Sequence, residues 1–212
     1  MPQAATEDGW VGSDVEKEFP GLGLLFLPVR VGDHAAAAEA KKRLADLEGY
    51  FTGTFVTGLP TRPVTAAYRV FYRQIGLDPD RDFTPLEWIV RKRLARGRFR
   101  SRGLLADALT IGAVETEIPI GAIRAADVLG PLGITTSRPG EAIDRPLPES
   151  TLVVADAAKP LAVLFGDLEE TSRYRADKKD FEVVLYATIV PGVAPATAAE
   201  ALWLTAAILG AE

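Results

Sequence analysis

The sequence predicts an α+β protein in which helices flank a mixed sheet within a single compact domain. Two continuous apolar runs, 21–31 (GLGLLFLPVRV) and 181–190 (FEVVLYATIV), are typical of buried strands. Apolar residues recur every three or four positions through 64–75, which is typical of an amphipathic helix. Strands and helices do not alternate regularly along the chain, which favours α+β over a doubly wound parallel sheet.

The predicted helices begin and end at residues with recognisable capping chemistry. Asp33 can accept hydrogen bonds from the first amides of an Ala-rich helix that we expect to reach about Glu48. Thr84 and Glu87 predict a capping box at the start of a helix that should end near Gly97. The remaining predicted elements are strands at 151–156 and 161–165, helices at 104–113 and 196–209, and loops at 51–63, 77–83 and 131–150.

Composition bounds the class of protein and its compartment. The chain has 212 residues, of which 48% are hydrophobic and 25% charged, so it can bury a substantial core. It has no cysteine, which excludes disulfides, thiolate nucleophiles and cysteine-based zinc sites, and we expect a reducing, cytoplasmic compartment. No apolar run approaches the roughly 20 residues that a membrane span needs, so we expect no membrane partner. We expect residues 1–14 to form an N-terminal tail and residues 15–212 to form the domain.

The common catalytic and cofactor motifs are missing from the sequence. The single histidine, His34, has no G-x-S-x-G element to serve, so it is a weak candidate for a catalytic base. The DPDRD segment at 78–82 imitates the start of a calcium loop, but Phe83 and Ile89 stand where that loop needs Gly and Glu. No Walker A or G-x-G-x-x-G motif occurs, and we expect neither a metal nor another cofactor.

Positive charge is concentrated in one stretch of a chain whose formal net charge is −5. Seven of the twelve residues from Arg91 to Arg102 are Lys or Arg. A sequence pI near 5.1 argues against a general nucleic-acid binder, and we expect no DNA partner. The basic stretch is therefore interpreted as a local RNA-contacting patch, a solvated helix face or a docking site for an acidic protein. The candidate RNA-binding residues are Arg91, Lys92, Arg96, Arg98, Arg100 and Arg102.

Arg93 is expected to differ from its basic neighbours. On a helical wheel it falls inside the apolar arc that Leu86 and Leu94 help to define. A buried guanidinium must be paired, because an isolated charge is costly to remove from water. We therefore expect Arg93 to meet either a carboxylate of the fold or an anionic ligand.

Several short motifs follow one another in a fixed order along the chain. The second half holds Ala155-Asp156 at a strand end, then Pro160-Leu161-Ala162, Gly166 in a turn, a charged loop at 166–180 and the apolar strand residues 183–185. In this order it resembles the B3/B4 domain of the phenylalanyl-tRNA synthetase beta subunit. The first half resembles the free-standing bacterial version of that domain. Its matching motifs are Ala67-Tyr68-Arg69, the basic residues 91–93 followed by Gly97, Leu105-Ala106-Asp107 and Pro119-Ile120-Gly121.

The resemblance spans about residues 15 to 210 and implies a protein that binds tRNA or aminoacyl-tRNA. In the synthetase, this domain hydrolyses tyrosine that is wrongly esterified to phenylalanine tRNA. The resemblance thus also implies an aminoacyl-tRNA deacylase, whose pocket needs only to position water and stabilise an oxyanion. The alternative is a non-catalytic module that binds an amino-acid-like ligand or another small metabolite.

The residues that the resemblance places in the pocket include two departures from the family. Gly166-Asp167 stands where the synthetase has Gly-Gly, and Tyr186 stands where it has Glu. The charged loop at 166–180 is interpreted as either a solvated hairpin or the rim of a pocket. Weak candidates for a catalytic carboxylate are Asp167 and Glu169. The implied substrate-binding residues are Gly121, Asp156, Gly166, Asp167, Arg173 and Arg93.

Overall fold

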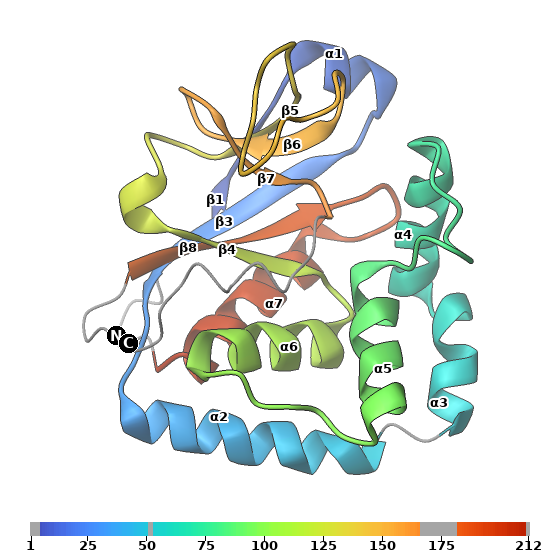
Figure 1. The fold of residues 1–212 in the computed structure, drawn as a ribbon, viewed down its shortest axis with the longest axis vertical. Coiled ribbons are helices and arrows are strands. Elements are labelled where there is room, and N and C mark those ends of the chain that lie inside the picture. Colours follow the sequence, from blue (N-terminus) through green and yellow to red (C-terminus); the bar gives the residue numbers. More distant parts are fainter. Residues whose placement is uncertain (1–4, 51–52, 166–181, 211–212) are drawn as a thin grey trace.

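The computed structural model describes residues 5–50, 53–165 and 182–210 and confirms the predicted α+β class. Its strands form two four-stranded sheets, and helices pack against them (Figure 1). No helix within these described ranges has the length and apolarity needed to traverse a bilayer. The helices described are α1 (Ser13–Glu18), α2 (His34–Asp46), α3 (Gly53–Gly58), α4 (Pro63–Gln74), α5 (Pro85–Arg96), α6 (Leu104–Thr116) and α7 (Pro195–Ile208), with 3-10 turns η1 (Leu47–Tyr50), η2 (Leu59–Thr61) and η3 (Ala125–Asp127).

The first sheet has the strand order β1-β3-β8-β4, and its neighbouring strands all run antiparallel. Its two long strands, β3 (Gly23–Arg30) and β8 (Glu182–Ile189), are the two apolar runs predicted from the sequence. The edges are β1 (Glu7–Asp8) and β4 (Ile120–Arg124). Because most side chains of β3 and β8 are buried, this pair of strands forms the centre of the fold.

The second sheet has the order β2-β5-β6-β7 and is mixed, whereas the sequence predicted a single mixed sheet flanked by helices. β2 (Trp10–Val11) runs parallel to β5 (Gly133–Thr136). β6 (Leu152–Ala155) pairs antiparallel with both β5 and β7 (Pro160–Val163). The N-terminal part of the chain therefore contributes a strand to each sheet.

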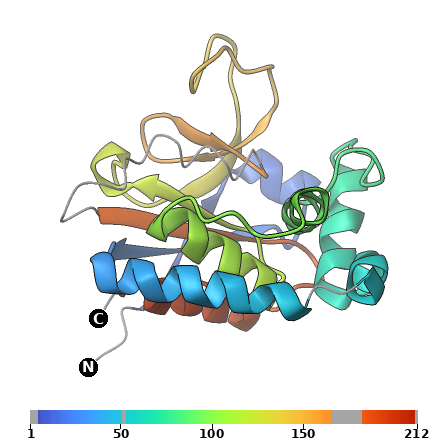
Figure 2. The same cartoon turned by 60° about the horizontal axis from the view of Figure 1, so that its bottom comes forward.

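Helices α2, α6 and α7 lie on one side of the first sheet and the second sheet lies on the other (Figures 1 and 2). α7 packs against β3 and β8, α6 packs against β4, and α2 packs on α6 and α7 from outside. α6 and α7 approach so closely that a Cβ added to Gly112 would clash with Thr205 Oγ1. The core between the helices and this sheet includes the fully buried Ile111, Leu185 and Leu202.

Three segments differ from their predictions. Residues 7–11, expected in a tail, form β1 and β2, and Trp10 Nε1 donates to the Pro131 carbonyl at 3.1 Å. Two-residue strands are too short to show the alternation by which a strand is recognised in sequence. The predicted loop at 51–63 contains α3, and the predicted loop at 131–150 contains β5.

Candidate functional site

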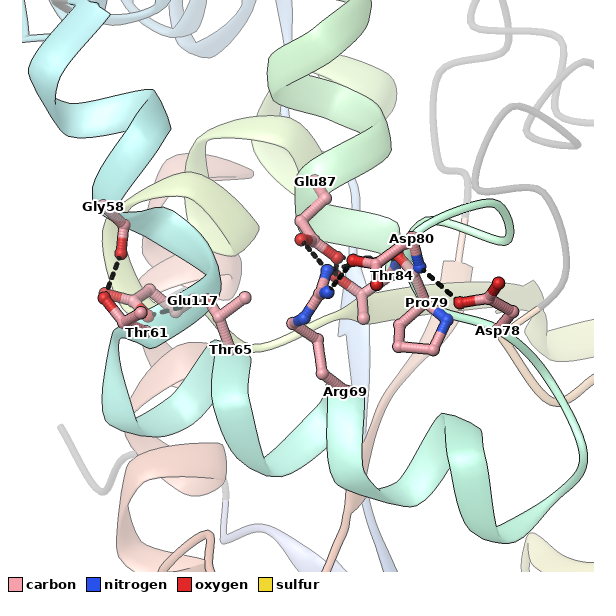
Figure 3. A network of polar contacts seen from close by, with 10 residues as sticks. All are labelled: Gly58, Thr61, Thr65, Arg69, Asp78, Pro79, Asp80, Thr84, Glu87 and Glu117. Carbon is pink, nitrogen blue, oxygen red and sulfur yellow. Dashed lines mark hydrogen bonds and ion pairs between the residues drawn. The ribbon is translucent and has the colours of Figure 1, made fainter.

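The start of α5, the helix that carries the basic stretch, is fixed by two sets of polar contacts. The predicted capping box is present: the Thr84 hydroxyl and backbone N–H donate to Glu87 Oε2 at 2.7 and 3.1 Å. Arg69 on α4 donates to Glu87 Oε1 at 2.6 Å and also pairs with Asp80 (Figure 3). Glu87 and Arg69 are only 5% and 9% exposed. The loop at 77–83 and the first turn of α5 are thereby tied to α4.

The other end of α5 leads into a basic loop that α6 holds in place. The helix ends at Gly97, whose φ of 73° lies in the left-handed region that glycine adopts without strain. Asp107 in the first turn of α6 accepts hydrogen bonds from Ser101 Oγ at 2.6 Å and from the Arg102 backbone N–H at 2.9 Å. Burial raises the pKa of Asp107, although both hydrogen bonds act to lower it. The 97–103 loop is therefore fixed by a buried carboxylate.

Glu48, in the 3-10 turn η1 that follows α2, provides a second attachment for the same region. Its carboxylate accepts from the Phe99 backbone N–H at 3.2 Å, and its carbonyl accepts from Arg93 Nη2 at 2.9 Å. The partner of Arg93 is therefore a backbone carbonyl, where we expected a carboxylate or a ligand. Arg93 Nε is buried and has no hydrogen-bond partner among the described residues. Leu94, expected in the apolar arc, is 44% exposed, so that part of the prediction is wrong.

Six cationic side chains line one groove, which we call the basic groove, between α5, the 97–103 loop and α6. It encloses about 60 Å³, and Trp88 and Phe99 lie among the cations that line it. Five of the six candidate RNA-binding residues are in this lining, and the guanidinium of the sixth, Arg91, lies 3.8 Å from the centre of the Phe83 ring. The cationic lining residues are Lys92, Arg93, Arg96, Arg98, Arg100 and Arg102.

The basic groove concentrates positive charge on exposed side chains. Arg96, Arg98 and Arg100 are exposed, and none of them forms an ion pair with a residue that the structure describes. Elsewhere the fold does pair its arginines, for example Arg43 with Glu115 at 2.5 Å. Like charges that share a groove repel one another and together raise the local positive potential. The arrangement therefore favours an anion that bridges several guanidinium groups.

Two aromatic side chains were not singled out from the sequence as functional residues. Trp88 is 40% exposed, and Lys92 Nζ lies 4.4 Å from the centre of its ring. Phe99 is half-buried between Arg98 and Arg100 in the chain. Aromatic residues interleaved with basic ones are a pattern typical of single-stranded nucleic-acid binding, and this was the signal available in the sequence.

Gly121 and Asp156, predicted in a substrate pocket, do not lie together in the structure. Gly121 is in β4 opposite Tyr186 of β8, and a Cβ at Gly121 would clash with the Tyr186 ring. Asp156 lies at the end of β6 in the second sheet, where it lines a different pocket. Neither residue lines the basic groove, which does contain Arg93. The structure thus places these three predicted residues at three separate positions.

Of the remaining candidates, His34 lies in the described part of the chain and the others lie outside it. His34, the weak catalytic candidate, is exposed at the first position of α2. In the part of the chain that the structure describes, no three histidine or carboxylate side chains gather as ligands for a metal ion. Gly166, Asp167, Glu169 and Arg173, and with them the charged loop at 166–180, lie outside the described residues.

No protein-family model matches this chain, and no curated protein matches it either. The resemblance to the B3/B4 domain is therefore carried only by the order of the short motifs in the sequence.

Proposed function

We propose that this chain is a protein of the B3/B4 kind that binds tRNA through the basic groove. The observation that carries the proposal is the gathering of six cationic side chains in one groove of a protein with a net charge of −5. Phosphate is the anion that such a cluster suits, because the planar guanidinium matches two phosphate oxygens at once. The order of motifs shared with the B3/B4 domain supports tRNA as the RNA.

Both the extent and the composition of the basic groove favour a nucleic-acid chain over a single small anion. One phosphate group would be satisfied by one or two arginines, whereas these cations extend from α5 through the 97–103 loop. Trp88 is exposed beside the cations and can stack on an unpaired base. An acidic protein would neutralise the same charge but would gain no base stacking from Trp88, so RNA is the better fit.

Binding of tRNA by a variant with three substitutions tests the proposal. Arg96, Arg98 and Arg100 are exposed and unpaired within the described residues, so R96A/R98A/R100A should fold normally. We expect fluorescence anisotropy to show about 10- to 100-fold weaker tRNA binding, because each lost charge-assisted contact removes a substantial part of the affinity.

The matched control is K42A/R73A/R145A, which removes three exposed cations outside the basic groove. Its charge change equals that of the groove variant, so any effect of net charge alone appears in both. Equal weakening by the two variants, or unchanged binding by the groove variant, would show that the groove is not the RNA site.

The resemblance extends the proposal to hydrolysis of mischarged aminoacyl-tRNA. An aminoacyl ester is already activated, so a positioned water and an oxyanion-stabilising group are sufficient. The assay is deacylation of tyrosyl-tRNA(Phe) and of a panel of other mischarged tRNAs, with a control lacking protein. Rapid loss of one ester would establish the activity and its substrate. If the protein binds tRNA but hydrolyses no member of the panel, the proposed deacylase activity is refuted and only the proposed tRNA binding stands.

The compartment proposed for this function is the cytoplasm. A chain of 212 residues without a cysteine fits a reducing compartment, since it gains nothing from an oxidising one. Mischarged tRNA is produced where protein synthesis takes place, so the proposed substrate and the proposed compartment agree. Fractionation of cells that express a tagged full chain checks this expectation.

A further inference from the structure

The second sheet carries another pocket, of about 360 Å³, which lies apart from the basic groove. Pockets of this size are in the range that holds small organic ligands. Its walls come from the β2–α1 junction, β5 and the turn between β6 and β7, elements that lie together in Figure 1. We call it the sheet pocket, and none of the features that support RNA binding depends on it.

Two of the carboxylates that line the sheet pocket are already occupied by backbone donors. Asp156 is 4% exposed and accepts hydrogen bonds from the backbone N–H groups of Leu129, Ala158 and Lys159 at 2.7 to 2.9 Å. Glu141 accepts from the backbone N–H of Arg138 at 2.8 Å. These carboxylates shape the walls of the pocket, because they fold the two turns that form its rim.

Two cationic residues line the sheet pocket. They are Arg138 and Lys159, and neither forms an ion pair with any residue in the described ranges. The third lining carboxylate, Asp14, has a side chain that is 94% exposed and lies 4.0 Å from Lys17. Lys159 does help to lower the pKa of Asp156, but that carboxylate is committed to its backbone donors. The pocket therefore presents two cations to a ligand.

A hydroxyl group and an aromatic ring complete the lining. Thr135 on β5 shares a face of the second sheet with Gly133 and with the lining residues Val153 and Ala155, and its hydroxyl has no hydrogen-bond partner among the residues that the structure describes. Trp10 is held in place by its hydrogen bond to the Pro131 carbonyl and packs over Gly133, where no Cβ would fit. A hydroxylated ligand can bond to the Thr135 hydroxyl while its carbon skeleton contacts the indole.

We propose that the sheet pocket binds a small hydroxylated organic anion that carries a carboxylate or phosphate group. The anionic group pairs with Arg138 and Lys159, because neither cation forms an ion pair with a residue that the structure describes and the guanidinium binds two oxygens at once. A hydroxyl group of the ligand faces Thr135. This site is independent of the basic groove and needs no RNA.

Calorimetry on the full chain tests the sheet pocket with defined probes. Gluconate supplies a carboxylate, glycerol 3-phosphate supplies a phosphate, and glucose and glycerol are the matched neutral compounds. We expect one of the two anions to bind and the neutral compounds to show no heat. Tryptophan fluorescence provides a second measurement of binding. The W88F/W203F variant keeps Trp10 and removes the other two tryptophans, so a ligand-induced change in its emission reports on the sheet pocket.

Substitutions at the two cations localise the binding. R138M and K159M change exposed side chains, so both variants should fold, and each should weaken the anion about tenfold or more. R145M is the control, because Arg145 is exposed nearby in the chain but does not line the pocket. Absence of binding by both anions up to millimolar concentration, or binding that R138M and K159M leave unchanged, would overturn the proposal. R96A/R98A/R100A should bind these anions normally, so failure of this site and failure of the RNA site can be distinguished.

Discussion

Replacement of Arg69 by methionine removes the guanidinium at the centre of the buried network that joins α4 to α5. In the wild-type protein this group donates to Glu87 Oε1 at 2.6 Å, to the Pro79 carbonyl at 3.1 Å and to Asp80 (Figure 3). Without it, the carboxylate of Glu87 keeps only Thr84 as a hydrogen-bond donor within the described part of the chain. A carboxylate that is 5% exposed is then left without a counter-charge.

The magnitude of this effect follows from the burial of each partner. Loss of one member of a buried ion pair typically lowers the free energy of unfolding by about 3–5 kcal/mol. The Asp80 side chain is 71% exposed, so its pairing with Arg69 adds less than about 1 kcal/mol. We therefore expect R69M to lose about 3–5 kcal/mol in total. For a chain of this length that corresponds to a Tm lower by roughly 6–20 °C.

Thermal and urea unfolding of four proteins measures the coupling between the two charges. The set is wild type, R69M, E87Q and R69M/E87Q, because glutamine keeps an acceptor for Thr84 while removing the buried charge. The double variant should lose less stability than the sum of the two single variants, since the uncompensated carboxylate is gone. A loss below about 1 kcal/mol in R69M, or simple additivity in the cycle, would refute the account of how α5 is held.

Three further predictions concern Asp107 beside the basic groove, Asp156 in the sheet pocket and the contact between α6 and α7. Because burial raises the pKa of Asp107, ionisation of this carboxyl opposes folding. The stability advantage of wild type over D107N should therefore shrink as pH rises through the pKa of Asp107 in the folded protein. Urea unfolding of both proteins at a series of pH values measures this difference in stability. Burial acts to raise the pKa of Asp156, but the backbone N–H donors outweigh burial and lower the pKa. The stability advantage of wild type over D156N should therefore be present above about pH 4 and be lost in acid. A stability advantage that persists in acid would contradict this prediction. G112A should lower the free energy of unfolding by about 1–3 kcal/mol through its clash with Thr205, and T205A should rescue part of that loss if the helix contact is as described.

The helix ends could be predicted because their chemistry is local. Asp33 accepts from the Ala35 and Ala36 amides at 2.8 and 3.4 Å, and Thr84 and Glu87 bond to each other. Each of these contacts joins residues at most three positions apart, so the sequence pattern and the hydrogen bond are nearly the same information.

The contacts that shape the candidate site could not be predicted because they join distant parts of the chain. Glu48 and Arg93 are 45 residues apart, and nothing in either segment indicates that the Glu48 carbonyl would meet that guanidinium. Leu94 was expected to be buried on helical periodicity, but it is 44% exposed, because periodicity shows which residues share a face and not how far the packing partner extends. The concentration of basic residues is visible in the sequence, whereas their arrangement around Trp88 required the tertiary structure.

The most direct test of the proposed RNA site is the salt dependence of tRNA binding. Each cation that neutralises a phosphate contributes about 0.7–0.9 to the slope of log Kobs against log salt concentration. We predict that R96A/R98A/R100A lowers the magnitude of that slope by about 2–3 relative to wild type, because three phosphate contacts are lost. K42A/R73A/R145A should keep the wild-type slope. Identical slopes for wild type and the groove variant would contradict the claim that these arginines contact RNA phosphates.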